Sequence, residues 1–420
     1  MSEIHVIVGL GYVGLPLARE AVRSGLRVAG FDVNARVVKD LNEGVSHVDD
    51  LSDADVKAML EEGFFASREE AVIKDAKTVV ICVPTPLADY GVPDLGPVVS
   101  AAHTVGRNLG RGALVILEST SYPGTTEEMV LPILEQESGL KAGDDFTLAF
   151  SPERIDPGNP IFGVSNTPKV VGGITPESTR AAMEFYGHFV NEVVRARGTR
   201  EAETAKLLEN TYRHVNIALV NEMVRFCHEL GIDFWDVIRL AKTKPFGFEA
   251  FYPGVGVGGH CIPIDPNYLS QVVRARLGYP FRFVELAQEI NSTMPSYVAT
   301  RVQEILNDDG IALKGAKVMI LGVTYKPNIA DQRESPVVPL ALALLRRGAA
   351  VEFHDPRVEE WNLGSLKLKR VKSLEDAVTS ADLTILAQKH KDYDLTRLCE
   401  MSRRFFDTTG SVTQPGAKRL

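Results

Sequence analysis

The chain has 420 residues, which is too many for a single hydrophobic core, so two or three domains are expected. Its hydrophobic fraction of 45% and charged fraction of 24% are typical of a globular protein that folds in water. The net charge of −9 argues against general nucleic-acid binding, because such binding depends on Lys and Arg side chains that neutralise phosphates.

The cysteines and the N-terminus favour a reduced, cytoplasmic setting. Cys82, Cys227, Cys261 and Cys399 are far apart, and none has the spacing of a metal site. Cys82 lies within an apolar strand pattern and is expected in the core. The N-terminus has no basic segment, so we expect no signal peptide. No apolar run is long enough to span a bilayer.

A glycine-rich turn follows the first predicted strand. Residues 4–8 are typical of a buried parallel strand, and residues 15–22 have a helical pattern. Between them, GLGYVG matches GxGxxG, whose glycines permit a tight turn, close approach of a pyrophosphate and close packing of helix on strand. The helix N-terminus would then direct its amides at the phosphates. The expected dinucleotide contacts are Gly9, Gly11, Tyr12, Val13 and Gly14.

The second predicted strand, residues 26–31, ends in Asp32. A carboxylate at this position can accept hydrogen bonds from both ribose hydroxyls and would repel a 2′-phosphate, so NAD is favoured over NADP. The alternative is a plain turn between strand and helix. The pattern, its context and Asp32 together favour dinucleotide binding.

Three further predicted strands, residues 78–83, 113–118 and 146–150, end in hydroxyl or charged residues. Ligands bind beyond the carboxyl ends of the strands in a doubly wound sheet, so these ends are expected to line a site. They belong to a predicted NAD-binding Rossmann domain of residues 1–196. N-capping of the next helix is the alternative for the hydroxyls. The residues concerned are Pro84, Thr85, Ser119, Thr120, Thr125, Thr126, Glu153 and Arg154.

A long amphipathic helix is predicted from Glu201, and Gly231 is its natural C-cap. Lys206 and Asn210 are four residues apart and therefore share a face beside the apolar stripe. Lys206 is either a site residue or an ordinary solvated lysine. A helix of this length between two domains is also a candidate subunit interface. The stripe consists of Ala205, Leu208, Tyr212, Val215, Leu219, Met223, Phe226 and Leu230.

Residues 254–266 begin with four glycines in six positions and continue into a single cysteine. A glycine-rich loop can press its backbone against a ligand, and Cys261 on such a loop can act as a nucleophile, with Asp265 four residues later. The alternative is that Cys261 is a small buried hydrophobe in a turn. This loop belongs to a predicted central helical segment of residues 197–306.

The βαβ rhythm returns in residues 307–420 without the glycine fingerprint. The strand at residues 317–323 is followed by a polar loop with Lys326 and Arg333, each either a phosphate contact or an ordinary surface cation. The predicted fold is therefore α/β, with two Rossmann-like doubly wound domains joined by a long central helix and a helical middle segment. The expected ligand site is the cleft between these domains, with Cys261 at its lip.

Seven motifs cover nearly the whole chain. They are GLGYVG at residues 9–14, VPTP at 83–86, STSYPGTT at 119–126, SPER at 151–154, AKLLEN at 205–210, GGHCIPIDP at 258–266 and YKPNIADQRESP at 325–336. In this order they resemble the UDP-glucose/GDP-mannose dehydrogenase family, the nucleotide-sugar 6-dehydrogenases. The resemblance favours Cys261 as a nucleophile over Cys261 as a buried hydrophobe.

The resemblance implies a four-electron oxidation of the sugar C6 alcohol to a carboxylate, with two NAD consumed in turn. Loss of the first hydride and of the hydroxyl proton gives an aldehyde. An aldehyde has no second hydride to give until a nucleophile adds to it. The Cys261 thiolate is therefore expected to form a thiohemiacetal and then a thioester, which water hydrolyses.

The same resemblance implies roles for other residues. Lys206 stabilises the developing oxyanion or carries the proton, and Asn210 helps to hold the oxyanion. Asp265 assists the water, Thr120 positions it, and Glu153 contributes to acid–base work. The expected sugar-nucleotide contacts are Glu153, Arg154, Lys206, Asn210, Tyr252, Gly256, Gly258 and Lys326. The further expected cofactor contacts are Pro84, Thr85, Ser119, Thr120 and Arg333.

Two departures change the expected sugar. UDP-glucose members carry an arginine upstream of the cysteine, and residues 242–248 contain none. They also carry a second glutamate after the SPE element, and residues 155–159 contain none. Both features resemble the UDP-N-acetylglucosamine 6-dehydrogenase branch, so UDP-GlcNAc is the expected substrate, with UDP-glucose or dTDP-glucose as alternatives. The resemblance also implies a homodimer built on the central helix.

Two other classes of protein stay open. A two-electron 3-hydroxyacid dehydrogenase shares the first domain and a lysine on the central helix, but it needs no cysteine in the glycine loop and lacks the last α/β domain. A regulatory NAD sensor without turnover would be indicated by loss of the cysteine, lysine or aspartate, and all three are present.

Overall fold

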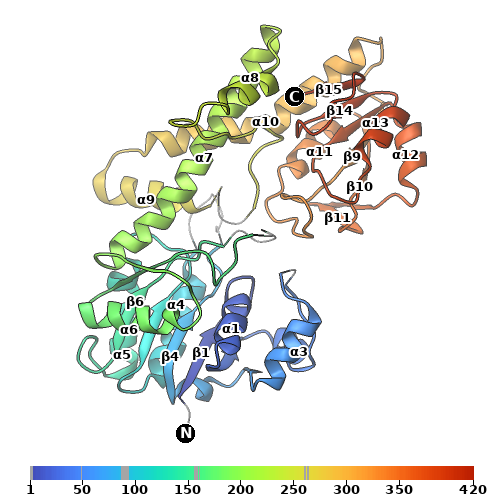
Figure 1. Cartoon of the computed structure of the whole chain (residues 1–420). Coiled ribbons are helices and arrows are strands. Elements are labelled where there is room, and N and C mark those ends of the chain that lie inside the picture. The colour runs from blue at the N-terminus through green and yellow to red at the C-terminus, as the bar shows by residue number, and fades with distance from the viewer. Residues whose placement is uncertain are drawn as a thin grey trace. The chain divides into compact units, whose positions relative to one another are not determined.

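The computed structural model describes residues 3–48, 50–86, 94–155, 159, 161–259, 262 and 264–420. The chain forms two compact units (Figure 1). Unit 1 contains Met1–Glu209 and Asn267–Gly278, and unit 2 contains Asn210–Pro266 and Tyr279–Leu420. The unit boundaries fall inside two helices. A division into two units does not test the predicted three segments with boundaries at residues 196 and 306, which stay a prediction.

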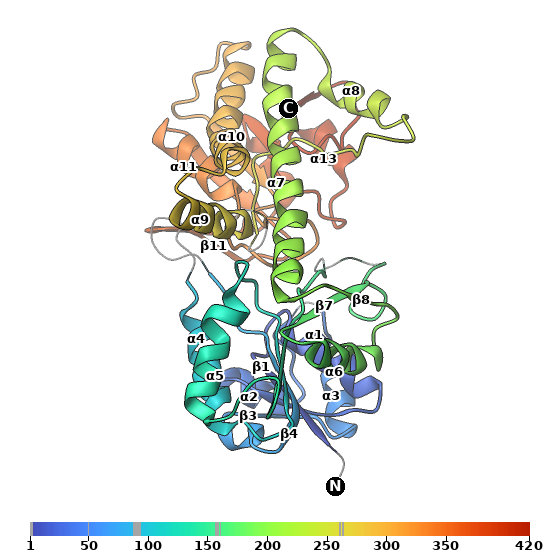
Figure 2. The same cartoon turned by 90° about the vertical axis from the view of Figure 1, so that its left-hand side faces the viewer.

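Unit 1 is built on an eight-stranded sheet in the order β3-β2-β1-β4-β5-β6-β7-β8. Neighbouring strands are parallel except for β6 and β7, which are antiparallel. Figure 2 shows α4 and α5 on one face of the sheet and α1 and α6 on the other. The strands are β1 (Ile4–Val8), β2 (Arg27–Phe31), β3 (Phe65–Ser67), β4 (Ala76–Ile81), β5 (Leu114–Leu117), β6 (Thr147–Phe150), β7 (Lys169–Gly173) and β8 (Val193–Arg195).

The helices of unit 1 follow the strands in the alternating order of a Rossmann domain. Because they cover both faces of the sheet, the central strands are buried at nearly every residue, as their continuous apolar sequences predict. The helices are α1 (Gly14–Arg23), α2 (Ala35–Asn42), α3 (Asp53–Glu61), η1 (Glu70–Ile73), α4 (Gly96–Asn108), η3 (Thr126–Val130), α5 (Leu131–Ser138) and α6 (Pro176–Gly187).

Unit 2 has a five-stranded parallel sheet in the order β10-β9-β13-β14-β15 and a separate antiparallel hairpin, β11-β12. This is the second predicted α/β domain. Its strands are β9 (Lys317–Leu321), β10 (Ala350–His354), β11 (Glu360–Leu363), β12 (Leu366–Lys369), β13 (Leu383–Leu386), β14 (Phe405–Asp407) and β15 (Ala417–Arg419). Its helices include α8 (Phe234–Ala241), α10 (Arg282–Asn307), α11 (Val337–Arg346), α12 (Leu374–Ser380) and α13 (Leu395–Met401).

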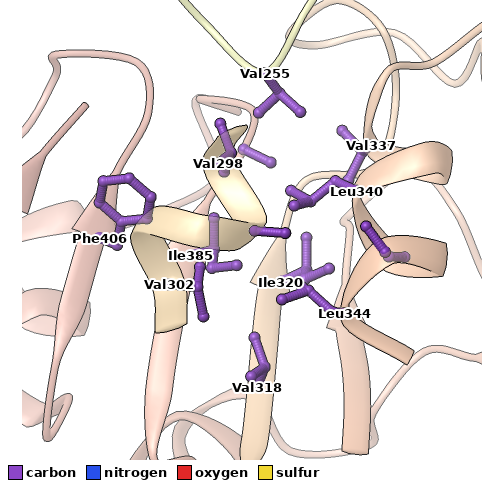
Figure 3. Packing of buried hydrophobic residues seen from close by; sticks show 14 of the residues in the cluster. Val255, Val298, Val302, Val318, Ile320, Val337, Leu340, Leu344, Ile385 and Phe406 are labelled. Carbon is purple, nitrogen blue, oxygen red and sulfur yellow. The ribbon is translucent and has the colours of Figure 1, made fainter. Parts of the chain in front are cut away.

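Alternate residues of β9 face two different cores. Val318 and Ile320 pack with residues of α10 and α11, whereas Met319 and Leu321 pack with residues of α12 and α13. This alternation is the two-residue period of a strand that is covered on both faces. Figure 3 shows the first core, in which the labelled side chains are Val255, Val298, Val302, Val318, Ile320, Val337, Leu340, Leu344, Ile385 and Phe406.

Two helices cross the unit boundaries, α7 (Thr199–Glu229) and α9 (Asp265–Leu277). The long helix α7 was predicted, and Gly231 follows it with a φ of 69°. Its predicted apolar stripe is not its buried face, because Leu208, Leu219 and Phe226 are all exposed. None of the described helices has an apolar stretch long enough to cross a membrane. The buried apolar positions of α7 are Ala202, Leu207, Ala218, Val220, Val224 and Cys227.

Candidate active site

The three glycines of the first turn have different surroundings. Gly9 has a φ of 91°, and a Cβ there would lie 2.8 Å from the Cys82 carbonyl oxygen. A Cβ on Gly14 would lie 1.9 Å from the Gly9 carbonyl oxygen, whereas a Cβ on Gly11 would meet no atom within 4 Å. Gly9 and Gly14 are therefore required by packing inside the turn. Gly11 faces open space, which fits the close approach of a phosphate group.

Asp32 holds this turn from the end of β2. Its Oδ2 accepts a hydrogen bond from the Leu10 amide at 2.9 Å, and its Oδ1 accepts one from the Asn34 amide at 2.8 Å. The side chain is half-buried, so the carboxylate keeps access to solvent at the edge where the adenosine ribose is expected. The first amides of α1 receive no side-chain cap from Val13. The residues present therefore fit a dinucleotide.

Side-chain hydrogen bonds connect the segment after β4 to the segment after β5 and to α9. The Ser119 hydroxyl donates to the Val83 carbonyl oxygen at 2.8 Å. The Thr85 carbonyl oxygen accepts from the Tyr268 hydroxyl of α9 at 3.0 Å. Cys82 is buried, as predicted. N-capping therefore does not account for Ser119. Around them, Pro84 is exposed, and Thr120, Tyr12 and Val13 are half-buried.

A buried glutamate on α7 fastens the turn of the STSYPGTT motif. The Glu203 carboxylate accepts from the Gly124 amide at 2.6 Å, the Thr126 amide at 2.9 Å and the Thr126 hydroxyl at 2.7 Å. Thr125 instead donates to the Tyr122 carbonyl oxygen at 2.7 Å. Burial raises the pKa of Glu203 to about 7, against these hydrogen bonds, which favour the charged form. The sequence analysis missed Glu203, because glutamate is rarely buried and nothing in the neighbouring sequence marks this one.

Lys206 is buried and not a solvated surface lysine. Its side chain is on the inner face of α7, and its ammonium donates to the Glu153 carbonyl oxygen. The neighbouring Arg154 forms an ion pair with Glu209 of α7 at 2.7 Å and donates to the Pro168 carbonyl oxygen at 2.8 Å. The SPER and AKLLEN motifs are thus brought together, as the predicted shared site requires.

A buried charged group lies behind Glu153 and was also missed. We call it the Glu118 cluster, and it consists of Glu118, Glu153, Lys169 and Tyr186. The Lys169 ammonium contacts both carboxylates, at 3.0 Å for Glu153, and the Tyr186 hydroxyl donates to Glu118 at 2.7 Å. The Glu153 carboxylate also accepts from the Arg154 and Ile155 amides, at 2.7 and 2.5 Å.

In unit 2, Asn210 and Asp265 are in direct contact. The Asn210 amide donates to Asp265 Oδ2 at 2.5 Å, and both side chains are buried. Asn210 is the last residue of the AKLLEN motif within α7, and Asp265, near the end of the GGHCIPIDP motif, is the first residue of α9. Cys261 lies outside the described residues, so its predicted position beside these groups stays a prediction.

The glycine loop before Cys261 packs tightly against the YKPNIADQRESP loop. A Cβ on Gly258 would lie 2.7 Å from the Glu334 carbonyl oxygen and from Tyr325 Cβ. A Cβ on Gly256 would lie 3.0 Å from Pro336 Cβ. These two motifs are about 70 residues apart in the chain, so only the fold brings them together. Gly256 and Gly258 are thus needed for loop packing, and their predicted contact with substrate stays a prediction.

The remaining predicted positions make contacts within unit 2. Arg333 forms an ion pair with Asp331 at 2.6 Å. The Lys326 carbonyl oxygen accepts from the Thr324 hydroxyl at 2.9 Å. Tyr252 is 49% exposed and stacks on Trp235 with ring centroids 6.2 Å apart. The described residues contain no group of three or more His, Cys, Asp and Glu side chains that could hold a metal ion.

Three family models match successive parts of the chain. They describe the NAD binding domain, the central domain and the UDP binding domain of the UDP-glucose/GDP-mannose dehydrogenase family, and they match residues 3–190, 200–293 and 319–414.

Individual proteins are similar over nearly the full length. The UDP-N-acetyl-D-glucosamine 6-dehydrogenase of Pseudomonas aeruginosa is 37% identical over 85% of this chain and 84% of its own. The UDP-N-acetyl-D-mannosamine dehydrogenase of Pyrococcus horikoshii is 35% identical over 92% and 89%. A solved structure of UDP-D-ManNAc dehydrogenase from Pyrococcus horikoshii has a TM-score of 0.90 and 32% identity and covers 99% of both chains.

Two alanine substitutions in the first turn should separate folding from cofactor binding. Gly14→Ala should lower the free energy of unfolding by roughly 3 kcal/mol, because its Cβ overlaps a backbone oxygen. Gly11→Ala should change that free energy by less than about 1 kcal/mol, because its Cβ meets no atom. Gly11→Ala should nevertheless weaken NAD binding about tenfold or more, as measured by calorimetry. Unchanged NAD affinity of a folded Gly11→Ala variant would exclude the turn as the pyrophosphate site.

Glu203 should make the protein less stable as the pH rises. Its folded-state pKa of about 7 lies above the value of about 4.3 in an unfolded chain. Between these values the unfolded chain binds fewer protons, so the stabilisation is fully present below pH 4.3 and is lost by about pH 7. The total is on the order of 3 kcal/mol. Urea unfolding of Glu203→Gln should lack this part of the pH slope. Parallel slopes in the variant and the unmodified protein would refute the assignment.

Proposed function

Because the chain belongs to the UDP-glucose/GDP-mannose dehydrogenase family and is an NAD-dependent nucleotide-sugar dehydrogenase, we propose a specific reaction for it. The proposed reaction is a four-electron oxidation. In this proposal the C6 alcohol of the sugar becomes a carboxylate, two NAD are consumed in turn, and the intermediates are attached to Cys261.

The burial of Lys206 is the observation that carries this proposal. An exposed lysine would be an ordinary surface cation, whereas Lys206 is on the inner face of α7 with its ammonium on the Glu153 main chain. A cation that is already removed from water interacts strongly with an oxyanion that develops beside it. Lys206 is therefore proposed to stabilise the oxyanion and to move the hydroxyl proton.

The cofactor would be held by the glycine turn after β1, by the N-terminus of α1 and by Asp32. Bound NAD supplies the hydride acceptor for both oxidation steps. The open space over Gly11 and the partly exposed carboxylate of Asp32 fit its pyrophosphate and ribose. Thr85, Ser119 and Arg333 are proposed as further contacts.

The second oxidation needs a nucleophile, and Cys261 is proposed to supply it. After the first oxidation the thiolate adds to the aldehyde carbon and forms a C–S bond, and the carbonyl oxygen becomes the thiohemiacetal oxygen. Loss of hydride and a proton leaves a thioester, and attack by water breaks the C–S bond and releases the acid. Asn210 is proposed to help hold the oxyanion, Asp265 to assist the water, Thr120 to position it, and Glu153 to contribute to acid–base work. A reduced compartment such as the cytoplasm would keep the thiol available.

We propose a C2-acetamido sugar as the substrate, with UDP-GlcNAc as the first choice. Relatives named for UDP-N-acetyl-D-glucosamine and for UDP-N-acetyl-D-mannosamine support the acetamido class. The absence of an arginine from residues 242–248 also favours this class over UDP-glucose. UDP-glucose and dTDP-glucose are the alternatives that a substrate panel should distinguish.

The decisive test counts NADH per sugar consumed. The purified enzyme is incubated with NAD and UDP-GlcNAc, UDP-ManNAc, UDP-GalNAc, UDP-glucose, GDP-mannose or dTDP-glucose. We expect two NADH and a uronate from one acetamido sugar. Cys261→Ala should lower kcat by on the order of 10⁴-fold or more, because no thioester can form. Cys399→Ala is the matched control, because Cys399 is a free cysteine that packs in a hydrophobic core of unit 2 with Met319 and Leu321. One NADH per sugar, or full activity of Cys261→Ala, would instead favour a two-electron dehydrogenase.

We also propose a homodimer that forms through α7. The exposed apolar residues of this helix repeat at helical spacing, with Leu208 66%, Leu219 52% and Phe226 45% exposed. A helix that buries one apolar face in its own core and presents a second to solvent is typical of a helix at a subunit interface. Tyr212 lies on the same face and is 46% exposed.

Charged substitutions on this face should yield a monomer. Light scattering with size-exclusion chromatography should give twice the chain mass of 45.9 kDa for the unmodified protein and one chain mass for the double variant Leu219→Glu, Phe226→Arg. The control is Leu366→Glu on the hairpin strand β12, where the side chain is 41% exposed. A dimer that survives the double variant would place the interface elsewhere.

A further inference from the structure

The Glu118 cluster places ionisable groups in the interior of unit 1. The side chain of Glu118 is 0% exposed, that of Lys169 is 5% and that of Glu153 is 11%. Burial of charged groups is costly, and a well-packed apolar core often serves stability equally well. The cluster also includes Glu153, which the proposed function assigns to acid–base work. A role in chemistry is therefore a better explanation than a role in stability.

The formal charges of the cluster do not balance. Lys169 supplies one positive charge to the carboxyl groups of Glu118 and Glu153. The Glu118 and Glu153 carboxyl groups also interact with each other, and a proton on one of them would let it donate a hydrogen bond to the other. One proton shared by the two carboxyl groups gives Glu118, Glu153 and Lys169 together a net charge of zero, and the Lys206 cation outside the cluster favours the charged form of Glu153 rather than of Glu118. This is the arrangement that places two neighbouring carboxyl groups at very different pKa values.

The environment places the shared proton on Glu118. Burial raises the pKa of Glu118 to about 7, against the opposing charge of Lys169. Burial also acts to raise the pKa of Glu153, but Lys169 and the hydrogen bond from Glu118 bring it down to about 2. Burial acts to lower the pKa of Lys169, but the two glutamates raise it above its ordinary value, so Lys169 stays charged.

Cys82 and Tyr186 also face the cluster, and neither titrates near neutral pH. Cys82 approaches from the end of β4, and burial raises the pKa of its thiol well above the usual range. Tyr186 approaches from α6, and burial raises the pKa of its hydroxyl as well. Lys206 of α7 faces Glu153 as a cation and donates to its main-chain oxygen. Among the described residues of the cluster, Glu118 is therefore the group that gains or loses a proton around pH 7.

We propose that Glu118 is a positioning residue that holds a proton and thereby sets how strong a base Glu153 is in the reaction. With Glu118 protonated, Glu153 accepts a hydrogen bond from it and is a weak base. When Glu118 releases its proton to solvent, two carboxylates share the single Lys169 ammonium. Their repulsion raises the proton affinity of Glu153, so Glu153 becomes a stronger base. The inference rests on the proposed function for Glu153.

Infrared spectroscopy of the resting enzyme tests the protonation without turnover. Difference spectra between pH 5.5 and pH 8.5 should contain the carbonyl stretch of a buried carboxylic acid that titrates near pH 7. Part of this band should be missing in Glu118→Gln. The matched control is Glu203→Gln, which removes another buried carboxyl with a pKa of about 7 and should remove a different part of the band. A wild-type spectrum without the band, or a full band in Glu118→Gln, would overturn the proposal even if the enzyme oxidises its sugar as proposed.

The pH profile of kcat then tests the effect on Glu153. In the wild type, kcat should rise about threefold to tenfold through pH 7 as Glu153 becomes a stronger base. Glu118→Gln should lose this rise, and Glu203→Gln should keep it. Tyr186→Phe should move the rise to higher pH, because it removes a donor to the Glu118 carboxylate. A purely structural role for Glu118 would lower kcat by the same factor at every pH, and that result would also overturn the proposal.

Discussion

An aspartate at the end of the second strand of each sheet holds the loop after the first strand in place. In unit 1, Asp32 accepts hydrogen bonds from the amides of Leu10 and Asn34. In unit 2, Asp355 accepts them from the amides of Val323 and Arg357. The loop in each case starts with a glycine of positive φ, Gly9 or Gly322, whose amide donates to the second strand. Because this loop lies where ligands bind in such sheets, the aspartate helps to set the geometry of the ligand-binding edge in each sheet.

The two aspartates differ in how exposed their carboxylates are. Asp32 is half-buried, whereas Asp355 is fully buried and accepts a hydrogen bond from His390 at 3.0 Å. His390 Nδ1 accepts from the Asn328 amide at 3.0 Å, so Nε2 carries the proton that is donated to Asp355. The His390 ring thus occupies the side of Asp355 that corresponds to the exposed side of Asp32. It also holds the YKPN segment through the Asn328 amide. The Asp355 carboxylate is therefore less accessible to a ligand than the Asp32 carboxylate.

The fold was predictable from sequence because it rests on local patterns. The apolar strands, the GxGxxG turn and the seven ordered motifs gave the two α/β domains and the family. The buried charges were not predictable in this way. Lys169 and Glu203 have the sequence surroundings of ordinary surface residues, and lysine and glutamate are rarely buried. Only the three-dimensional fold places Lys169 between two carboxyl groups and Glu203 behind the turn at Thr126.

The helix α7 shows why periodicity alone does not identify the buried face of a helix. It has apolar residues on two faces, and its exposed stripe is longer and more regular than its buried one. The buried face contains small residues such as Ala202 and Ala218 together with polar groups such as Glu203 and Lys206. Small and polar residues weaken a hydrophobic pattern, yet the polar residues Glu203 and Lys206 are the ones that form hydrogen bonds with the segments after β5 and β6 of unit 1. In α7, the face that contains Glu203 and Lys206 therefore has a weaker hydrophobic pattern than the exposed face.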